Sequence, residues 1–303
     1  MRLPDFLVIG AAKAGTVSLY HYLGQHPQIL MCPVNECNFF ALEAADWTKH
    51  FRGPVDRLYL DQHCVKTLEV YRRLFDKAGP HQMIGESSPL YLFSALAAAR
   101  IRHHIPNVKI VAILRQPVDR AFSNYQHFRQ AQIEPIADFR EAIRAEPVRR
   151  AQGWGPWPFW YYAEMGFYAR QLQNYFALFG RKQILVVLYE DLKSNPVGLL
   201  KRIYEFVGVD PAYTPDTSTR HNLGGVPRWD WLQRLMVKPS FAKSVAKSVL
   251  PTRMRHDFRN RIADWNTQKA ALDPNVRAEL NRVYRDDILN LQELIGRNLT
   301  QWL

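Results

Sequence analysis

The sequence predicts an α/β fold in which a central parallel sheet is covered by helices on both faces. Near-continuous apolar runs, which suit strands buried on both sides, occur at residues 6–10, 83–86, 108–115 and 183–190. Helical patterns lie between these runs, and this alternation is typical of a parallel, three-layered arrangement. The 303 residues are enough to bury a large core.

Five segments repeat apolar residues at helical spacing, and we expect them to form the outer layers and a C-terminal packing element. They are residues 16–26, 95–104, 118–132, 163–180 and 275–296. Beyond Pro227 the chain looks helical and ends in the last of these segments.

The chain carries a strong positive charge. Forty Lys and Arg residues against 28 Asp and Glu give a formal net charge of +12, which favours an anionic partner. A polyanionic nucleotide or an acidic acceptor fits this charge as well as nucleic acid does. The densest basic stretch, residues 238–261, is interpreted as a solvated helical surface, and no nucleic-acid partner is expected.

The N-terminus and the cysteines favour a cytoplasmic location. The first apolar run, FLVI, is too short for a signal-peptide core or a membrane span. We therefore expect no membrane span, and peripheral membrane contact stays open. Three cysteines without zinc spacing are expected to be ordinary thiols, and no metal site is predicted.

Residues 6–23, FLVIGAAKAGTVSLYHYL, have the pattern of a strand, a glycine-containing loop and a helix. The first amides of such a helix point toward one place and attract an anion. Thr16 and Ser18 add hydroxyl donors, and Lys13 adds a full positive charge. The segment therefore predicts a phosphate-binding loop.

The position of Lys13 separates this loop from an ATP-binding P-loop, which reads G-x-x-x-x-G-K-[ST]. Gly10 and Gly15 have the P-loop spacing, but Thr16 follows Gly15 directly and the lysine lies upstream. The predicted strands also lack a terminal Asp that would hold magnesium. The fold is therefore expected to be P-loop-like, with a nucleotide kinase as the weaker alternative.

A second pair of anion-binding residues follows the third strand. In ILRQPVDRAFSNYQHF, Arg115 ends the strand and Ser123 lies two turns into the next helix, so one phosphate could contact both side chains.

Together, IGAAKAGTVSL and ILRQPVDRAFSNYQHF resemble the two cofactor motifs of the sulfotransferases that use 3′-phosphoadenosine 5′-phosphosulfate (PAPS). Further segments resemble those of heparan sulfate and bacterial sulfotransferases, in the same order. They are NECNFF (35–40), GESSPLYLF (85–93), LVVLYEDLKSNP (185–196) and RHNLGGVPR (220–228). The resemblance implies one domain over 1–303, with a PAPS-binding core at about 5–210 and a cofactor-covering loop and C-terminal helices at about 211–303.

The resemblance also implies roles for individual residues. Lys13 contacts the leaving phosphate oxygen of PAPS, whereas Arg115 and Ser123 hold the 3′-phosphate. Tyr189 lies near the adenine ring. The other implied contacts to PAPS, or to its product 3′,5′-diphosphoadenosine (PAP), are Ala14, Gly15, Thr16, Val17, Ser18, Arg220, Gly224, Gly225 and Arg228.

Sulfuryl transfer requires a general base that takes the proton of the acceptor. The resemblance implies Glu86 in GESSPLYL, and its place at the end of a strand would let it reach a cleft. A structural role for Glu86, as a helix cap or a partner of Lys13, is the alternative. The rival bases are His63, His81 and His221.

The expected acceptor is a hydroxyl or amine of a carbohydrate or glycoconjugate, because the resemblance is to the glycan-modifying branch. The aromatic segment 149–162 could stack on sugar rings, and core packing explains it equally well. A lipid, polyketide or aryl hydroxyl is the alternative acceptor. A nucleic-acid-binding module is disfavoured, because it would need no phosphate loop.

Overall fold

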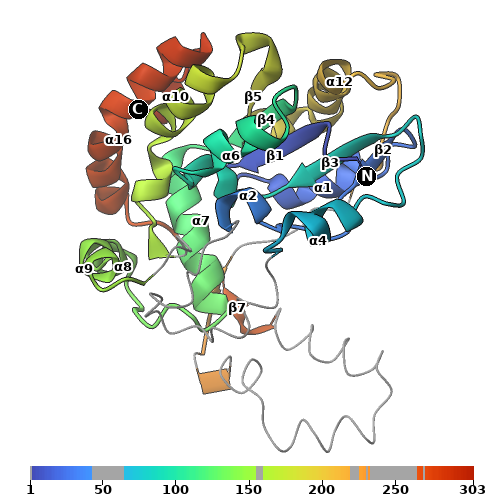
Figure 1. The fold of residues 1–303 in the computed structure, drawn as a ribbon. Coiled ribbons are helices and arrows are strands. Elements are labelled where there is room, and N and C mark those ends of the chain that lie inside the picture. Colours follow the sequence, from blue (N-terminus) through green and yellow to red (C-terminus); the bar gives the residue numbers. More distant parts are fainter. Residues whose placement is uncertain are drawn as a thin grey trace, which may run out of the picture.

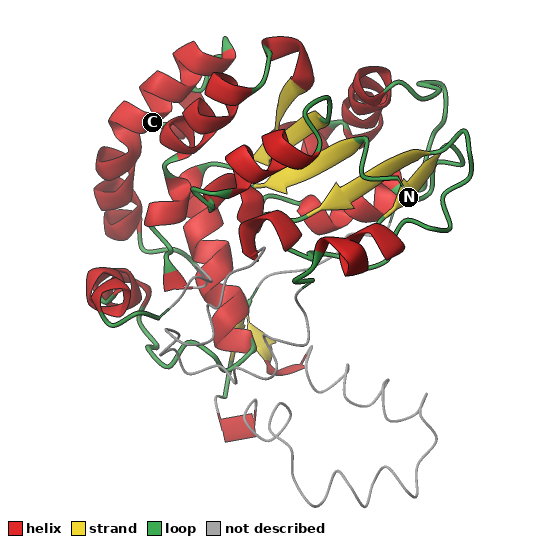
Figure 2. Cartoon of the chain, viewed as in Figure 1, coloured by secondary structure: helices red, strands yellow, loops and turns green. Residues whose placement is uncertain are grey.

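A five-stranded parallel sheet forms the centre of the molecule in a computed structural model (Figures 1 and 2). In spatial order its strands are β2 (Ile29–Met31), β3 (Met83–Ser87), β1 (Phe6–Gly10), β4 (Lys109–Leu114) and β5 (Ile184–Leu188). The α/β class and the parallel sheet expected from the sequence are confirmed. The structure describes residues 2–42, 65–154, 160–218, 225–229, 231–232, 265–268 and 270–303.

Helices surround this sheet. They are α1 (Thr16–Leu23), α2 (Phe39–Leu42), α4 (Leu68–Arg73), α5 (Leu90–Phe93), α6 (Ala97–His104), α7 (Pro117–Gln130), α8 (Phe139–Arg144), α9 (Glu146–Ala151), α10 (Tyr168–Leu178), α11 (Tyr189–Ser194), α12 (Pro196–Val207) and α16 (Pro274–Ile295). Short 3-10 turns occupy Glu164–Gly166, Arg181–Gln183 and Thr300–Trp302, and β6 (Val226–Pro227) pairs antiparallel with β7 (Thr267–Gln268).

Successive residues of each strand face opposite sides of the sheet, and each side has its own core. Phe6 and Val8 pack on one face with side chains from α1 and α12. Leu7 and Ile9 pack on the other face with residues of α5, α6 and α10. Because helices cover both faces, the strands have no polar face, which explains their near-continuous apolar sequence.

Helix α7 descends below the sheet in Figure 1 and starts directly after β4. The Gln116 side chain accepts a hydrogen bond from the Asp119 amide at 2.8 Å, which caps the helix. Pro117 occupies the first turn, where its missing N–H is not needed. These local signals place Arg115 at the sheet edge and Ser123 on the adjoining helix.

Several boundaries differ from the sequence-based expectation. The strand expected at 183–190 ends at Leu188, and α11 begins at Tyr189. Helix α12 was not expected, although the Asn195 side chain caps it at the Gly198 amide (2.9 Å) and Gly208, at φ 89°, ends it. Strand β2 has three residues, too few for a recognisable periodic pattern.

A buried ion pair fixes the chain between α7 and α10. Arg149 donates from both terminal nitrogens to the Glu134 carboxylate, at 2.7 and 2.8 Å, and both side chains are almost fully buried. The Tyr162 hydroxyl donates to the same carboxylate at 2.7 Å. Trp160 and Tyr162 from the aromatic segment are fully buried, so these two rings belong to the core.

Breaking this pair is expected to destabilise the fold strongly. Arg149→Met leaves the Glu134 carboxylate buried without its cation, which costs roughly 3–5 kcal/mol of unfolding free energy. Urea denaturation followed by circular dichroism measures the loss. The double variant Glu134→Leu with Arg149→Met is expected to recover most of it, and a double variant as unstable as the single one would contradict this account.

Candidate active site

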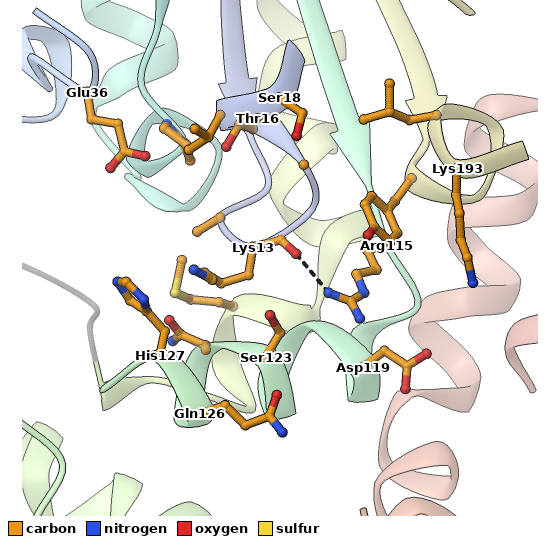
Figure 3. Close-up of a pocket in the computed structure, with 18 of the residues that line it drawn as sticks. Lys13, Thr16, Ser18, Glu36, Arg115, Asp119, Ser123, Gln126, His127 and Lys193 are labelled. Carbon is orange, nitrogen blue, oxygen red and sulfur yellow. Dashed lines mark hydrogen bonds between the residues drawn. The ribbon is translucent and has the colours of Figure 1, made fainter. Parts of the chain in front are cut away.

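A cavity of about 500 Å³ opens at the carboxyl edge of the sheet, where parallel α/β folds bind ligands. Its wall comes from the β1–α1 loop, the segment before α2, the start of α5, helix α7 and the β5–α11 junction (Figure 3). The lining includes Lys13, Gly15, Thr16, Val17, Ser18, Glu36, Asn38, Arg115, Ser123, His127 and Tyr189. Both predicted anion-binding motifs therefore face one space.

The loop from β1 to α1 has the backbone shape that its glycines predict. Gly15 has a φ of 93°, and in the described part of the chain no side chain caps the first amides of α1. A Cβ added at Gly15 would lie 2.9 Å from the Leu192 side chain and 3.0 Å from the Tyr189 ring. The loop thus needs glycine there, and it leaves helix N–H groups available to an anion.

Lys13 lies in this loop with a φ of 66°. Removal from water lowers the pKa of its ammonium to about 8, and the charges of Arg115 and Arg120 lower it further, while Glu36 opposes them. In Figure 3 the ammonium points into the cavity, on the side of Glu36 and His127. A cation that is poorly hydrated and close to other cations favours an incoming anion strongly.

Arg115 and Ser123 lie together on the opposite wall. An Arg115 Nη atom donates to the Lys13 carbonyl at 3.2 Å, drawn as the dashed line in Figure 3, and the guanidinium lies 4.8 Å from the centre of the Tyr189 ring. Ser123 points from α7 toward the space between Lys13 and Arg115. This part of the cavity can hold a second anionic group beside an aromatic ring.

Glu36 is an acidic residue of the cavity that the sequence analysis did not select. It follows β2 and lines the wall opposite α7, within electrostatic reach of Lys13. The residue is exposed to solvent, yet the protein that surrounds its carboxyl raises the pKa of this group, and the Lys13 charge partly offsets the rise. The signal was present in NECNFF, where the acid precedes two aromatic residues that enter the core.

His127 is the histidine that α7 presents to the same end of the cavity. The residue is exposed to solvent, yet the protein around its ring and the charge of Lys13 lower the pKa of the imidazole, which favours the neutral form. It was not among the histidines named from the sequence. Of those, His81 is exposed and does not line the cavity, whereas His63 and His221 lie outside the described residues.

A family model described as "Sulfotransferase family" matches residues 4–215, which is more than half of the chain. The chain belongs to the sulfotransferase family. Over its whole length it is also 31% identical to a sulfotransferase from Alicyclobacillus acidocaldarius, covering 99% of that chain with a TM-score of 0.77.

Longer relatives share this sulfotransferase region. Mouse bifunctional heparan sulfate N-deacetylase/N-sulfotransferase 3 is 28% identical over 313 residues, which cover all of this chain and 31% of the relative. The chain thus spans about a third of the length of the curated relatives that it matches. A mouse sulfotransferase solved with PAP is more distant, at 16% identity over 71% of this chain and a TM-score of 0.40.

Glu86 does not occupy the position in the sulfotransferase cavity that the sequence analysis expected. Its side chain is fully buried within β3 and is absent from the lining. The Tyr71 and Ser88 hydroxyls donate to its carboxylate from the side of the sheet that carries α2, α4 and α5. The expectation failed because Glu86 lies one residue before the point at which β3 ends, so its side chain faces the core.

The other predicted binding residues divide into three groups. Val17, Thr16 and Ser18 line the cavity, whereas Ala14 is buried behind it. Gly225 packs against β7, and Arg228 stacks over Trp229 outside the lining. Arg220 and Gly224 lie outside the described residues.

Within the described ranges, no group of three or more His, Cys, Asp or Glu residues is arranged to hold a metal ion. None of the helices that the structure describes is long and apolar enough to span a bilayer. Cys32 and Cys37 are buried free thiols, and Cys64 lies in a part of the chain that is not described.

Proposed function

We propose that the protein transfers a sulfuryl group from PAPS to a hydroxyl or amine of a carbohydrate or glycoconjugate. One observation carries this proposal: the loop with Lys13, the Arg115–Ser123 pair and the Glu36 carboxylate all face the same cavity. PAPS supplies an activated sulfuryl group on a phosphate leaving group.

The donor set fits the chemistry of PAPS. PAPS carries anionic groups at two places, the 5′-phosphosulfate and the 3′-phosphate, and the cavity offers two separate sets of hydrogen-bond donors. The first set is Lys13 with the uncapped amides of α1, and the second is Arg115 with Ser123. Tyr189, beside Arg115, offers an aromatic face to the adenine ring. The volume of about 500 Å³ is in the range of small-ligand sites.

Two residues supply the chemistry that the reaction needs. The Lys13 ammonium stabilises the negative charge that develops on the leaving oxygen. The Glu36 carboxylate takes the proton that the acceptor loses as its oxygen or nitrogen bonds to sulfur. The opposite charges of Lys13 and Glu36 each favour the charged form of the other, which partly offsets the pKa shifts that the surrounding protein imposes on both groups.

The acceptor class rests on the relatives. Those with the longest aligned regions are named for heparan sulfate N-sulfotransferase activity, and the aligned region includes this entire chain. A glycan with an exposed amine or hydroxyl is therefore the acceptor that we propose for this chain.

A titration with PAP tests donor binding directly. We expect micromolar binding without added metal by isothermal titration calorimetry, and about 10- to 100-fold weaker binding for Arg115→Ala, because a charge-assisted contact to phosphate is lost. Arg181→Ala, an exposed arginine far from the cavity on the C-terminal side of α10, serves as the control. A preference for Mg-ATP over PAP would contradict the proposal.

The acceptor is tested by transfer from ³⁵S-labelled PAPS to a panel. The panel contains N-deacetylated heparosan, chitosan oligosaccharides, 4-nitrophenol and dodecanol. We expect label on one of the two amino glycans. Label confined to 4-nitrophenol or dodecanol would refute the glycan acceptor while leaving the donor assignment intact.

A further inference from the structure

Glu86 is a buried carboxylate that the proposed reaction does not use. The described part of the chain places no Lys or Arg in an ion pair with it. Instead, the Tyr71 hydroxyl donates to one oxygen at 3.2 Å, and the Ser88 hydroxyl donates to the other. The Tyr91 hydroxyl and the Cys37 thiol lie close enough to this carboxyl to lower its pKa. A carboxylate with this many neutral donors is a hub that joins several elements.

Ser88 connects this hub to the segment that carries Glu36. The Ser88 Oγ accepts a hydrogen bond from the backbone N–H of Asn38 at 2.9 Å, and the same hydroxyl donates its hydrogen to the Glu86 carboxylate. A serine hydroxyl can make both bonds at once. The carboxylate therefore orients the hydroxyl, and the hydroxyl holds the backbone at Asn38.

The segment held in this way has an uncommon backbone conformation. Glu36 and Asn38 have φ values of 60° and 54°, in the left-handed region that non-glycine residues seldom adopt. Such residues keep this conformation only where their surroundings impose it. The Asn38 side chain adds a bond to the Glu36 carbonyl at 2.5 Å, which closes the turn on itself.

The alternation of side chains along this turn links the hub to the cavity. Cys37 points inward, is fully buried and contacts the Glu86 carboxylate. Its neighbours Glu36 and Asn38 line the cavity. Holding Cys37 and the Asn38 amide against the hub therefore turns Glu36 outward, toward Lys13.

We propose that Glu86 and Ser88 are positioning residues that hold the turn Glu36–Asn38 in the shape that presents the Glu36 carboxylate to the acceptor. This inference rests on the proposed function, because it assumes that Glu36 takes the proton. It gives Glu86 a role in the same reaction without contact with either substrate.

Two serines in one segment provide a matched test. Ser88→Ala removes the bridge, whereas Ser87→Ala removes a buried hydroxyl that has no hydrogen-bond partner among the residues that the structure describes. With ³⁵S-PAPS and the best acceptor of the panel above, Ser88→Ala is expected to lower kcat by about 10- to 100-fold, because small displacements of a catalytic group have effects of that size. Ser87→Ala is expected to keep the kcat of the unaltered protein. PAP affinity is expected to be unchanged in both.

A double variant separates positioning from general damage. In a Glu36→Gln background, Ser88→Ala is expected to lower kcat no further, because the group that it positions is already gone. Hydrogen exchange at the Asn38 amide is expected to accelerate in Ser88→Ala and not in Ser87→Ala. Should Ser88→Ala fail to fold, Ser88→Cys, which fills similar space and is a poorer acceptor, is measured in its place.

Equal kcat values for Ser88→Ala and Ser87→Ala would overturn the inference. A kcat for the double variant that is lower than that of Glu36→Gln alone would also overturn it, because Glu86 and Ser88 would then act independently of Glu36. Failure of the proposed function looks different: the unaltered protein would then bind no PAP and transfer no label to any panel member.

Discussion

Replacing Lys13 with alanine is expected to lower the rate of sulfuryl transfer by about 10²- to 10³-fold, the effect of removing one group that stabilises a developing oxyanion. The loop backbone and Arg115–Ser123 remain, so PAP is expected to bind with only moderately reduced affinity. Single-turnover transfer from ³⁵S-PAPS measures the chemical step, and calorimetry measures binding. Lys182→Ala, an exposed lysine outside the cavity, is the control.

The pKa of Lys13 gives this prediction a second readout. Its ammonium is charged below a pKa of about 8, so kcat/KM for PAPS is expected to fall as the pH rises through about 8. Lys13→Arg keeps its charge far above that pH, so this alkaline limb is expected to move to higher pH. An alkaline limb that stays in place in Lys13→Arg would show that another group sets it.

Replacing Glu36 with glutamine is expected to lower kcat by about 10²- to 10⁴-fold while PAP binding persists, because the variant loses the proton acceptor and keeps the size of the side chain. In the unaltered protein kcat is expected to fall at low pH as Glu36 becomes protonated, and this acid limb of the pH profile should disappear in Glu36→Gln. That limb is expected above the usual glutamate range, since the protein around the Glu36 carboxyl raises its pKa and transfer requires its ionised form.

Two comparisons sharpen the Glu36 prediction. Glu36→Asp, which shortens the side chain and keeps the carboxylate, is expected to retain part of the activity and the acid limb. Near-normal turnover in Glu36→Gln would instead assign the proton to His127, the histidine at the same end of the cavity.

Glu86→Gln is expected to reduce transfer too, for a different reason. The amide cannot accept hydrogen bonds on both of its terminal atoms, so it keeps only part of the hub around Ser88 and Tyr71. The resulting loss should be smaller than that of Glu36→Gln, and the acid limb set by Glu36 should remain. A larger loss in Glu86→Gln would favour the assignment first drawn from the sequence.

The fold and the anion-binding half of the site could be predicted because their signals are local. Apolar runs that alternate with helical patterns indicate a parallel sheet, and the carboxyl ends of its strands share one edge. The spacing in GAAKAGT, and the eight residues from Arg115 to Ser123, are set by a single loop and a single helix each. Such distances do not depend on how distant segments meet.

The acidic half of the site depended on tertiary contacts. GESSPLYL and NECNFF both offer a glutamate beside a strand, and nothing within either segment shows which one reaches the cavity. Glu86 is kept out of the cavity because its side chain lies on the core-facing side of β3. Glu36 reaches the cavity because the backbone of the turn at Glu36 and Asn38 is held by Ser88, which follows β3. His127 became a cavity residue in the same way, because α7 presents it beside Lys13.

The sequence by itself therefore determined the fold class and the location of the Lys13 loop and the Arg115–Ser123 pair at one edge of the sheet, because each depends on residues that lie close together along the chain. Only the tertiary structure decided which carboxylate faces Lys13 and which one is enclosed in the core. The physical reason is that a side chain's exposure and pKa are set by the segments packed around it, and those segments come from distant parts of the chain.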